Sequence, residues 1–497
     1  MRILFFSVIG MLLLTGCAVG PDFESPLAPN TQSYTETELP EKTIETKEHG
    51  GKAQYFVKGA DIPAEWWELF HSKPLDELIK KAIKNNPTLQ AAQAALNKAE
   101  EELNVSISSL FPSITAQATP QRQRFNPDMF DQSIPPVTFN LFNASVSVSY
   151  ILDVFGGIRR QIESSAALAE NKQFELEATY LTLTANVVTA AITEASLRDQ
   201  IQATKDLIAS QEKVLGITKK KYALGGSSRL DVLAQEAQLA QTQASLPLLQ
   251  IELSKTRNAL SVYIGEVPSQ SHLPTFHLAD LELPQDLPVS IPSDFIRQRP
   301  DIRAAEATLH SASAQIGVAT ANLLPQLNIT GTDFGWSALR LEHLFRDTSV
   351  FWDLVANLVQ PIFDGGKLIS QREAALDAFE QACAQYKQAV LTGFQNVADT
   401  LQALELDAQF LNIQTQAEIA AKKTLDITQT QYSIGAIDYV NLLVAQRTYH
   451  TARVEQIKAQ ASRYTDTTAL FQALGGGWWN RQCCKSPETN TCEPHDK

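Results

Sequence analysis

The chain has 497 residues, a formal net charge of −14 and an isoelectric point of about 5.1, which excludes the basic surface that nucleic-acid binding needs. Charged residues make up 19%, slightly below the usual share for globular proteins. This composition suits either the polar, weakly charged wall of a water-filled duct or an ordinary solvated helical surface.

The first residues, "MRILFFSVIGMLLLTGC", predict export from the cytoplasm. Arg2 precedes an apolar run from Ile3 to Leu14, which is too short to span a bilayer. The run ends at "LTGC", which resembles a bacterial lipobox, so residues 1–16 are expected to be a signal peptide and Cys17 the lipid-attached N-terminus. Three acyl chains satisfy the requirement of several anchors for stable attachment. Because Ala18 and not Asp follows, the sorting rule favours the outer membrane; an ordinary signal with a chance cysteine is the alternative.

The next elements are a linker and a long helix. Residues 17–62 are rich in Pro, Thr and Glu and are expected to be a linker draped from the anchor. Apolar residues then recur at helical spacing and predict one helix of about 36 residues from Leu75 to Leu110, ending at Pro112. Trp66 and Trp67, just before it, suggest either packing in a belt or sugar stacking, and we favour packing.

Two strands with alternating apolar and polar residues follow the helix, in "SITAQAT" and "FNASVSVSYIL". They predict a β-hairpin at about residues 113–153, with the apolar side facing lipid and the polar side facing a lumen. A half-buried soluble sheet has the same alternation. Arg122 and Arg124 are expected on the outer loop, and Pro135 and Pro136 are expected to stiffen it.

A very long helix, a glycine turn and a returning helix complete the first half. The long helix is predicted from Gly157 to Gly225 and contains no proline, which gives a length of roughly 100 Å at 1.5 Å per residue. Lys219, Lys220 and Lys221 near its end favour a solvated face. The returning helix has about 36 residues, and Pro247 predicts a kink in it.

The whole pattern then occurs a second time. "PTLQAAQAALNKAEEELNVSISSLFP" from Pro87 matches "PDIRAAEATLHSASAQIGVATANLLP" from Pro300, an offset of 300 − 87 = 213. A second hairpin is expected at about residues 326–363, and a second long helix from Gly366 to Gly435. The predicted domains are therefore a first repeat at 63–265, a Pro-rich crossover at 266–292, a second repeat at 293–475 and a tail at 476–497.

Four strands cannot close a barrel, and an open edge is forbidden in hydrocarbon because its backbone groups lack partners. Several chains must therefore pool their strands, and three chains would give twelve, an even number in the range observed for such barrels. The expected fold is an α+β membrane protein in which a long α-helical coiled-coil barrel continues a transmembrane β-barrel.

The chain resembles the TolC superfamily of outer membrane efflux proteins, in its NodT or OprM-like lipoprotein branch, because six motifs of that family occur in the same order. They include "CAVGPDFESP", "LDVFGGIRR", "GAIDYVNLLVAQRTY" and "ALGGGW", and they extend from Cys17 to Trp478. The resemblance implies a trimer with a twelve-stranded barrel and a twelve-helix periplasmic tunnel. It also implies a passive duct that works with a periplasmic adaptor and an inner-membrane pump, expected to be of the RND type.

The resemblance also implies two functional regions. The helical tips are expected to contact the adaptor through Gly225, Ser227, Ser228, Leu230, Asp231, Gly435, Ile437 and Asp438. The periplasmic gate is expected at Tyr432, Val440, Val444 and Arg447. Relatives commonly carry "LDAQR" where this chain has "LVAQR", so Val444 replaces the usual carboxylate. Gate closure is then expected to depend on apolar packing, with Asp438 or Asp231 as the remaining partners of Arg447.

The sequence contains no H-E-x-x-H, G-x-S-x-G or Walker motif, so neither an enzyme nor a cofactor or metal site is expected. An oxidising periplasm permits a disulfide among Cys483, Cys484 and Cys492. Drug, metal-ion and protein export stay open as alternatives, because the pump selects the cargo. The competing class is a lipid-anchored periplasmic scaffold that binds partners without conducting, although such a scaffold does not need lipid-facing hairpins.

Overall fold

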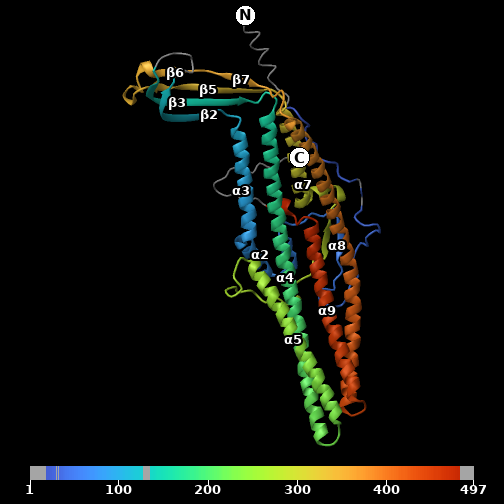
Figure 1. The fold of residues 1–497 in the computed structure, drawn as a ribbon. Coiled ribbons are helices and arrows are strands. Elements are labelled where there is room, and N and C mark those ends of the chain that lie inside the picture. The colour runs from blue at the N-terminus through green and yellow to red at the C-terminus, as the bar shows by residue number, and fades with distance from the viewer. Residues whose placement is uncertain (1–17, 30, 32, 127–134, 482–497) are drawn as a thin grey trace. The chain divides into compact units, whose positions relative to one another are not determined.

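A computed structural model describes residues 18–481 apart from 30, 32 and 127–134. Long helices and one larger sheet dominate it (Figure 1). The chain divides into two compact units. The first unit consists of Met1–Pro26, Ala95–Gln173 and Ala304–Lys387. The second unit consists of Leu27–Ala94, Phe174–Arg303 and Gln388–Lys497. The expected lipid site Cys17 and the tail cysteines Cys483, Cys484 and Cys492 lie outside the described residues.

The sheet of the first unit is built from both hairpins. Its strands are β2 (Ser113–Phe125), β3 (Val137–Leu152), β5 (Gln326–Ala338), β6 (Val350–Trp352) and β7 (Ala356–Val359). The order is β2-β3-β5-β6, with β7 also paired to β5, and every pairing is antiparallel.

The register explains the period-two pattern. Ile114 lies opposite Val148, whereas Ser113 lies opposite Ser149, so apolar pairs and polar pairs occupy opposite faces. The expectation of one continuous last strand is wrong. The structure has two short strands, β6 and β7, because residues 353–355 leave the strand conformation. The sequence "WDLVANLVQP" lacks a regular alternation, which agrees with this break.

The long helices agree with the expectation. α4 (Gly157–Ala223) and α8 (Lys367–Ser433) have 67 residues each, and the returning helices α5 (Arg229–Tyr263) and α9 (Tyr439–Ala473) have 35 each. α5 runs through Pro247 as one helix, and the kink expected there stays a prediction.

The single helix expected from Leu75 to Leu110 is wrong, because the chain breaks at Asn86. α2 (Lys73–Asn85) and α3 (Pro87–Ser108) replace it, and Asn86 has an extended backbone with ψ 121°. The second repeat breaks in the same way at Arg299, between α6 (Pro292–Gln298) and α7 (Pro300–Ala321). A proline disfavours the helical conformation in the residue before it, so Pro87 and Pro300 each begin a new helix.

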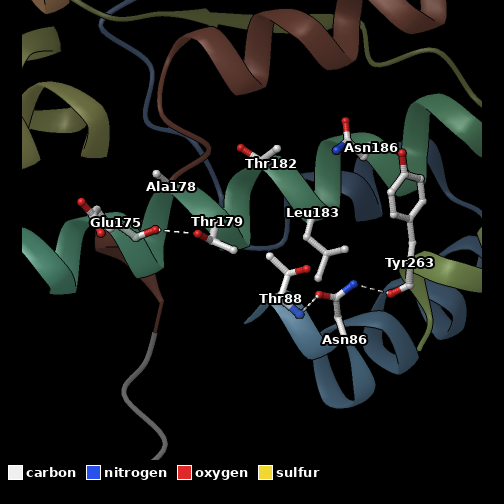
Figure 2. Close-up of a pocket in the computed structure, with 9 residues that line it drawn as sticks. All are labelled: Asn86, Thr88, Glu175, Ala178, Thr179, Thr182, Leu183, Asn186 and Tyr263. Atoms are coloured by element: carbon white, nitrogen blue, oxygen red, sulfur yellow. Dashed lines mark hydrogen bonds between the residues drawn. The ribbon is translucent and has the colours of Figure 1, made fainter. Parts of the chain in front are cut away.

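Each break meets the end of a returning helix within the second unit. The amide of Asn86 donates to the carbonyl of Tyr263 at 2.9 Å and accepts from the N–H of Thr88 at 2.9 Å (Figure 2). In the second repeat, the Arg299 guanidinium donates to the carbonyl of Ala473 at 2.9 Å. The expected end-to-end arrangement of half-length helices is therefore held by a side chain at the break itself.

The segment expected to be a draped linker is partly ordered. β1 (Tyr55–Lys58) pairs in parallel with β4 (Asp286–Val289), which lies in the expected crossover. Arg463 of α9 is fully buried and donates to the carbonyls of Gly50 and Lys52 and to Gln54 Oε1, at 2.8–3.2 Å. A buried side chain thus fixes residues 50–54 to α9.

Trp66 and Trp67 lie in the short helix η1 (Trp66–Phe70) and are each 1% exposed. Trp66 stacks on Phe471 with ring centroids 5.3 Å apart, and the Trp67 indole donates to Asp76 at 3.2 Å. Their rings are enclosed by the protein, which agrees with packing and leaves no face for a sugar.

Candidate functional site

Both expected tips are built by the same helix-ending turn. Gly225 and Gly435 have φ of +79° and +77°. The N–H of Gly226 donates to the carbonyl of Lys221 at 2.8 Å, and the N–H of Ala436 donates to the carbonyl of Gln431 at 2.9 Å. This hydrogen-bond pattern is a Schellman motif, which places a left-handed residue just after the helix. A Cβ at either position would meet nothing within 4 Å, so space does not require glycine there. Glycine is favoured because it adopts a positive φ without strain.

The helix that leaves the first tip begins with a capping box. The Ser228 hydroxyl accepts from the N–H of Asp231 at 3.1 Å, and the Asp231 carboxylate accepts from the N–H of Ser228 at 3.0 Å. Ser227 also donates to this carboxylate, at 3.0 Å. The hydrogen bonds from Ser228 and then Ser227 lower the pKa of Asp231. At the second tip Asp438 occupies the cap position without a side-chain hydrogen bond.

The tips present apolar side chains to solvent in the single chain. Leu224 is 88% exposed, and Leu230 and Ile434 are 75% and 76% exposed. The expected contact residues beside them, Ser227 and Ile437, are partly exposed, and Ser228, Asp231 and Asp438 lie on the same loops or the first helical turn. The structure therefore groups the sequence-predicted tip residues at two loop ends.

The gate residues do not all face the same way. Tyr432 points inward: its hydroxyl is 2.8 Å from the Thr218 hydroxyl, and the Lys221 ammonium lies 4.7 Å from its ring centroid. Val440 and Val444 are exposed on α9, one turn apart.

Arg447 is also exposed, and it forms no ion pair with the described part of this chain. Asp231, one of its two expected partners, is held in the capping box. Lys219 of the lysine run pairs with Glu236 of α5 at 2.6 Å, which agrees with a solvated face between neighbouring helices.

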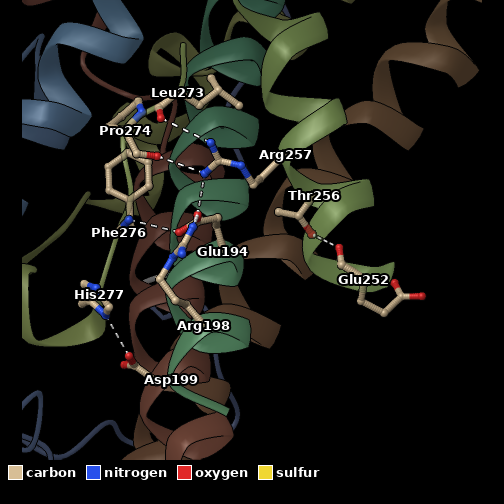
Figure 3. Close-up of polar contacts among 10 residues, drawn as sticks. All are labelled: Glu194, Arg198, Asp199, Glu252, Thr256, Arg257, Leu273, Pro274, Phe276 and His277. Atoms are coloured by element: carbon tan, nitrogen blue, oxygen red, sulfur yellow. Dashed lines mark hydrogen bonds and ion pairs between the residues drawn. The ribbon is translucent and has the colours of Figure 1, made fainter. Parts of the chain in front are cut away.

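A buried charge cluster, which the sequence did not predict, connects α4, α5 and the crossover (Figure 3). Glu194 is fully buried and accepts from Arg198, from Arg257 at 2.8 Å and from the N–H of Phe276 at 3.1 Å. Arg257 also donates to the carbonyls of Leu273 and Pro274, at 3.3 and 3.2 Å. Nothing in the helical pattern separates Glu194 from other glutamates of α4, so only the three-dimensional structure identifies it.

A second ionisable cluster, with half-buried carboxyl groups and a buried arginine, lies between α8 and α9. Burial is the main cause that raises the pKa of Asp407 to about 8, and the hydrogen bond and charge of Asp466 add to it. Burial likewise lowers the pKa of the neighbouring Arg463 to about 10. Burial and a neighbouring carboxyl group both disfavour the charged form of Asp407, so this side chain favours the protonated form.

The other polar features have ordinary explanations. Glu65, Glu68 and Asp76 lie close enough to hold a metal ion, but the Lys80 ammonium is 2.8–3.9 Å from all three carboxylates. A cavity of about 500 Å³ beside Asn86 is lined largely by uncharged side chains of α4, together with Tyr263 (Figure 2). No helix among the described residues is long and apolar enough to cross a membrane.

Comparison with known proteins identifies the fold and the role together. Residues 78–266 and 291–476 match the family "Outer membrane efflux protein". The chain belongs to this family. Its two matched segments cover both helix–hairpin–helix repeats.

Named relatives of this efflux family member cover most of its length. It is 30% identical over 417 residues to the pyoverdine export outer membrane protein OpmQ of Pseudomonas putida, covering 83% of this chain and 88% of the relative. It is 25% identical to the cation efflux system protein CusC of Escherichia coli, covering 94% and 97%. The solved outer-membrane channel OprN has a TM-score of 0.82 and 26% identity, covering 93% of this chain and all of that one.

The open state of the Neisseria gonorrhoeae MtrE channel has the same fold, with a TM-score of 0.79 at 24% identity. The protein is therefore an outer membrane channel component of an efflux system, as the sequence predicts. Its relatives are channel proteins, which agrees with the expected absence of enzymatic chemistry.

Proposed function

We propose that this protein is the trimeric exit duct of a tripartite efflux pump. It passively conducts small toxic compounds from an RND-type inner-membrane pump, through a periplasmic adaptor, to the cell exterior. The sheet of the first unit supplies four strands per protomer to a twelve-stranded barrel, with the last strand interrupted.

The open edges of that sheet support this proposal most strongly. β2 pairs only with β3 among the described strands, and β6 and β7 pair only with β5. Apolar side chains are exposed near the second edge, including Trp352 and Leu358 at 74% and 70%. Lipid solvates the exposed apolar side chains but leaves the backbone groups of an open edge without partners, so edges joined between chains supply the missing hydrogen bonds.

The experiment is a native mass measurement combined with bilayer recording. The full protein, purified in detergent, is expected to have the mass of three chains and to form conducting pores in planar bilayers. A folded, monodisperse monomer refutes the trimer, and a trimer that never conducts refutes the duct and supports a scaffold.

We further propose that Cys17 carries the lipid anchor. The residues just after it are tightly held in the first unit: the N–H of Val19 donates to the carbonyl of Phe155 at 3.0 Å, and Arg160 pairs with Asp22 at 2.6 Å. Phe155 lies between β3 and α4, so the chain after Cys17 is fixed beside the end of the sheet. This attachment supports the proposal, because it holds the first described residues beside the sheet that is proposed to occupy the membrane.

The tips and the gate complete the proposal. The exposed loops at Gly225 and Gly435 present Ser227, Leu230 and Ile437 to an adaptor. Val440 and Val444 of three chains form an apolar constriction, which water wets poorly. This constriction replaces the charge pair that the missing carboxylate at Val444 would provide.

A further inference from the structure

The tip half of the second unit encloses glutamine side chains that have no hydrogen-bond partner. Gln235 of α5 and Gln446 of α9 are 1% and 0% exposed, and both amide atoms of each lack a partner among the described residues. Gln211 of α4 is 1% exposed, and its carbonyl oxygen also has none. Such amides have lost their hydrogen bonds to water without replacement, which disfavours the packed state.

Two of these side chains border one apolar cluster. Val214, Tyr439 and Leu442 are buried together at this end of the bundle. Gln211 lies three residues before Val214 on α4, and Gln446 lies four residues after Leu442 on α9. By helical spacing, each shares the buried face of its neighbour. α4 runs toward its tip and α9 away from its own (Figure 1). By sequence order, both glutamines therefore lie on the side of the cluster away from the tips.

Gln235 on α5 lies at a distance from its tip comparable to that of Gln446 on α9. It is seven residues past the cap Ser228, whereas Gln446 is eight residues past the cap Asp438. We call Gln211, Gln235 and Gln446 the glutamine layer. Gln235 and Gln446 therefore lie about two helical turns from the tips, and Gln211 lies 223 − 211 = 12 residues, just over three turns, before the end of α4 at Ala223.

A second copy of the chain cannot satisfy these amides. They are already enclosed by their own helices at 0–1% exposure, so a neighbouring protomer finds no surface through which to reach them. Separation of the helices exposes these amides to bulk water, which supplies the missing hydrogen bonds. Separation therefore relieves a penalty that packing imposes, and the layer favours the separated state relative to an apolar core.

We propose that the glutamine layer comprises positioning residues for channel opening: unpaired amides buried between the helices keep the packed tip half only marginally preferred, so that a docking partner can separate it. The inference rests on the proposed function, in which this end of the duct opens. In this inference, the glutamines that favour opening are buried and contact neither the cargo nor the adaptor. Apolar side chains of similar size at these positions should lock the packed state.

The test compares Gln235→Leu and Gln446→Leu with the wild-type protein by amide hydrogen exchange on the purified full-length channel. Exchange in α5 and α9 next to the tips is expected to slow by about tenfold in each variant, because the packed state no longer encloses an unpaired amide. In planar bilayers the same variants should spend a smaller fraction of time in the high-conductance state. Gln446→Met, with an unbranched side chain, repeats the test if leucine does not fit.

Gln456→Leu is the matched control. Gln456 lies on the same helix and is 1% exposed, but its carbonyl oxygen accepts from Arg453 at 2.7 Å. Losing this satisfied contact should leave exchange near the tips unchanged or faster. Slowed exchange at Gln235 and Gln446 but not at Gln456 supports the inference.

Unchanged or faster amide exchange in both Gln235→Leu and Gln446→Leu overturns the inference, because a glutamine that only stabilises the packing gives that result. If the wild-type trimer proves non-conducting, the proposed function fails, while the exchange comparison still decides whether the layer weakens packing.

Discussion

Replacing Glu194 by alanine removes the carboxylate that joins α4 to α5 and to the crossover. Arg257 is only partly exposed, with a side-chain exposure of 30%, and it loses its charged partner. Arg198 and the N–H of Phe276 lose theirs at the same time. Removing one partner of a buried pair leaves charge uncompensated, which costs about 3–5 kcal/mol.

The position of the lost contacts determines which part of the protein is destabilised. Phe276 lies in the crossover, where Arg257 also holds the carbonyls of Leu273 and Pro274. We expect local opening of residues 271–277 rather than dissolution of the long helices, whose backbone hydrogen bonds remain. Limited proteolysis and amide exchange of the purified protein should show faster cleavage and exchange in this segment, by about 100-fold or more for a loss of 3 kcal/mol.

Glu194→Gln is the graded control, since it keeps an acceptor for Arg257 and the N–H of Phe276 while removing the charge. Its effect should be intermediate. A double variant with Arg257→Met should recover part of the loss, because the stranded charge is gone. Equal protection of residues 271–277 in the wild-type protein and Glu194→Ala would refute the reasoning and show that Leu278 and the other buried apolar residues alone hold the crossover.

Four further outcomes are expected. Gly435→Val strains a turn that requires positive φ, so drug resistance should fall while membrane levels of the protein stay normal; unchanged resistance would exclude this loop from the proposed adaptor interface. The raised pKa of Asp407 means that the native state holds a proton which the unfolded chain loses near pH 4, so unfolding free energy falls as pH rises toward about 8. Asp407→Asn should flatten that dependence and stabilise the protein at pH 7 by about 1–2 kcal/mol after solvent screening, as a pH series of chemical denaturation would measure. Val440→Gly should clearly raise single-channel conductance and Asp438→Asn should change it little; the opposite ranking would favour a gate made of carboxylates. Cys17→Ala should abolish labelling by radioactive palmitate, and a wild-type mature protein without acyl mass would exclude the anchor.

Periodicity predicted the elements whose side chains repeat in a regular pattern. The two 67-residue helices and the alternating faces of the hairpins follow from helical or alternating spacing, and the turns at Gly225 and Gly435 follow from the glycine that ends each long helix. The break at Asn86 was also readable, because Pro87 follows it, but the surrounding apolar pattern continues across the junction and outweighed that signal. A regular pattern therefore predicts which face is buried more reliably than where the backbone stays continuous.

Contacts between distant short segments had no such signal. β1 and β4 have four residues each and pair across more than 200 positions, and neither "YFVK" nor "DLPV" is long enough to show alternation. The buried status of Glu194, Arg463 and Gln446 likewise depends on which helix lies opposite. Polar residues on a long helix look alike in sequence until their neighbours are known.

The two repeats show where this architecture accepts a change in length. The difference in residue number between corresponding positions is 213 for Pro87 and Pro300 and for the starts of β2 and β5. It is 435 − 225 = 210 at the tips and 475 − 265 = 210 just after the returning helices. Three residues are therefore missing from the second hairpin region, after β5 and before α8, while the helices keep 67 and 35 residues in both copies. A deletion of three residues inside a packed helix would rotate every later side chain by about 60° relative to its partner face. A hairpin loop absorbs the same deletion without changing the register of the strands beside it. The region of the interrupted strand β6–β7 is thus where the second repeat is three residues shorter, whereas the long and the returning helices, in which register governs packing, keep their lengths.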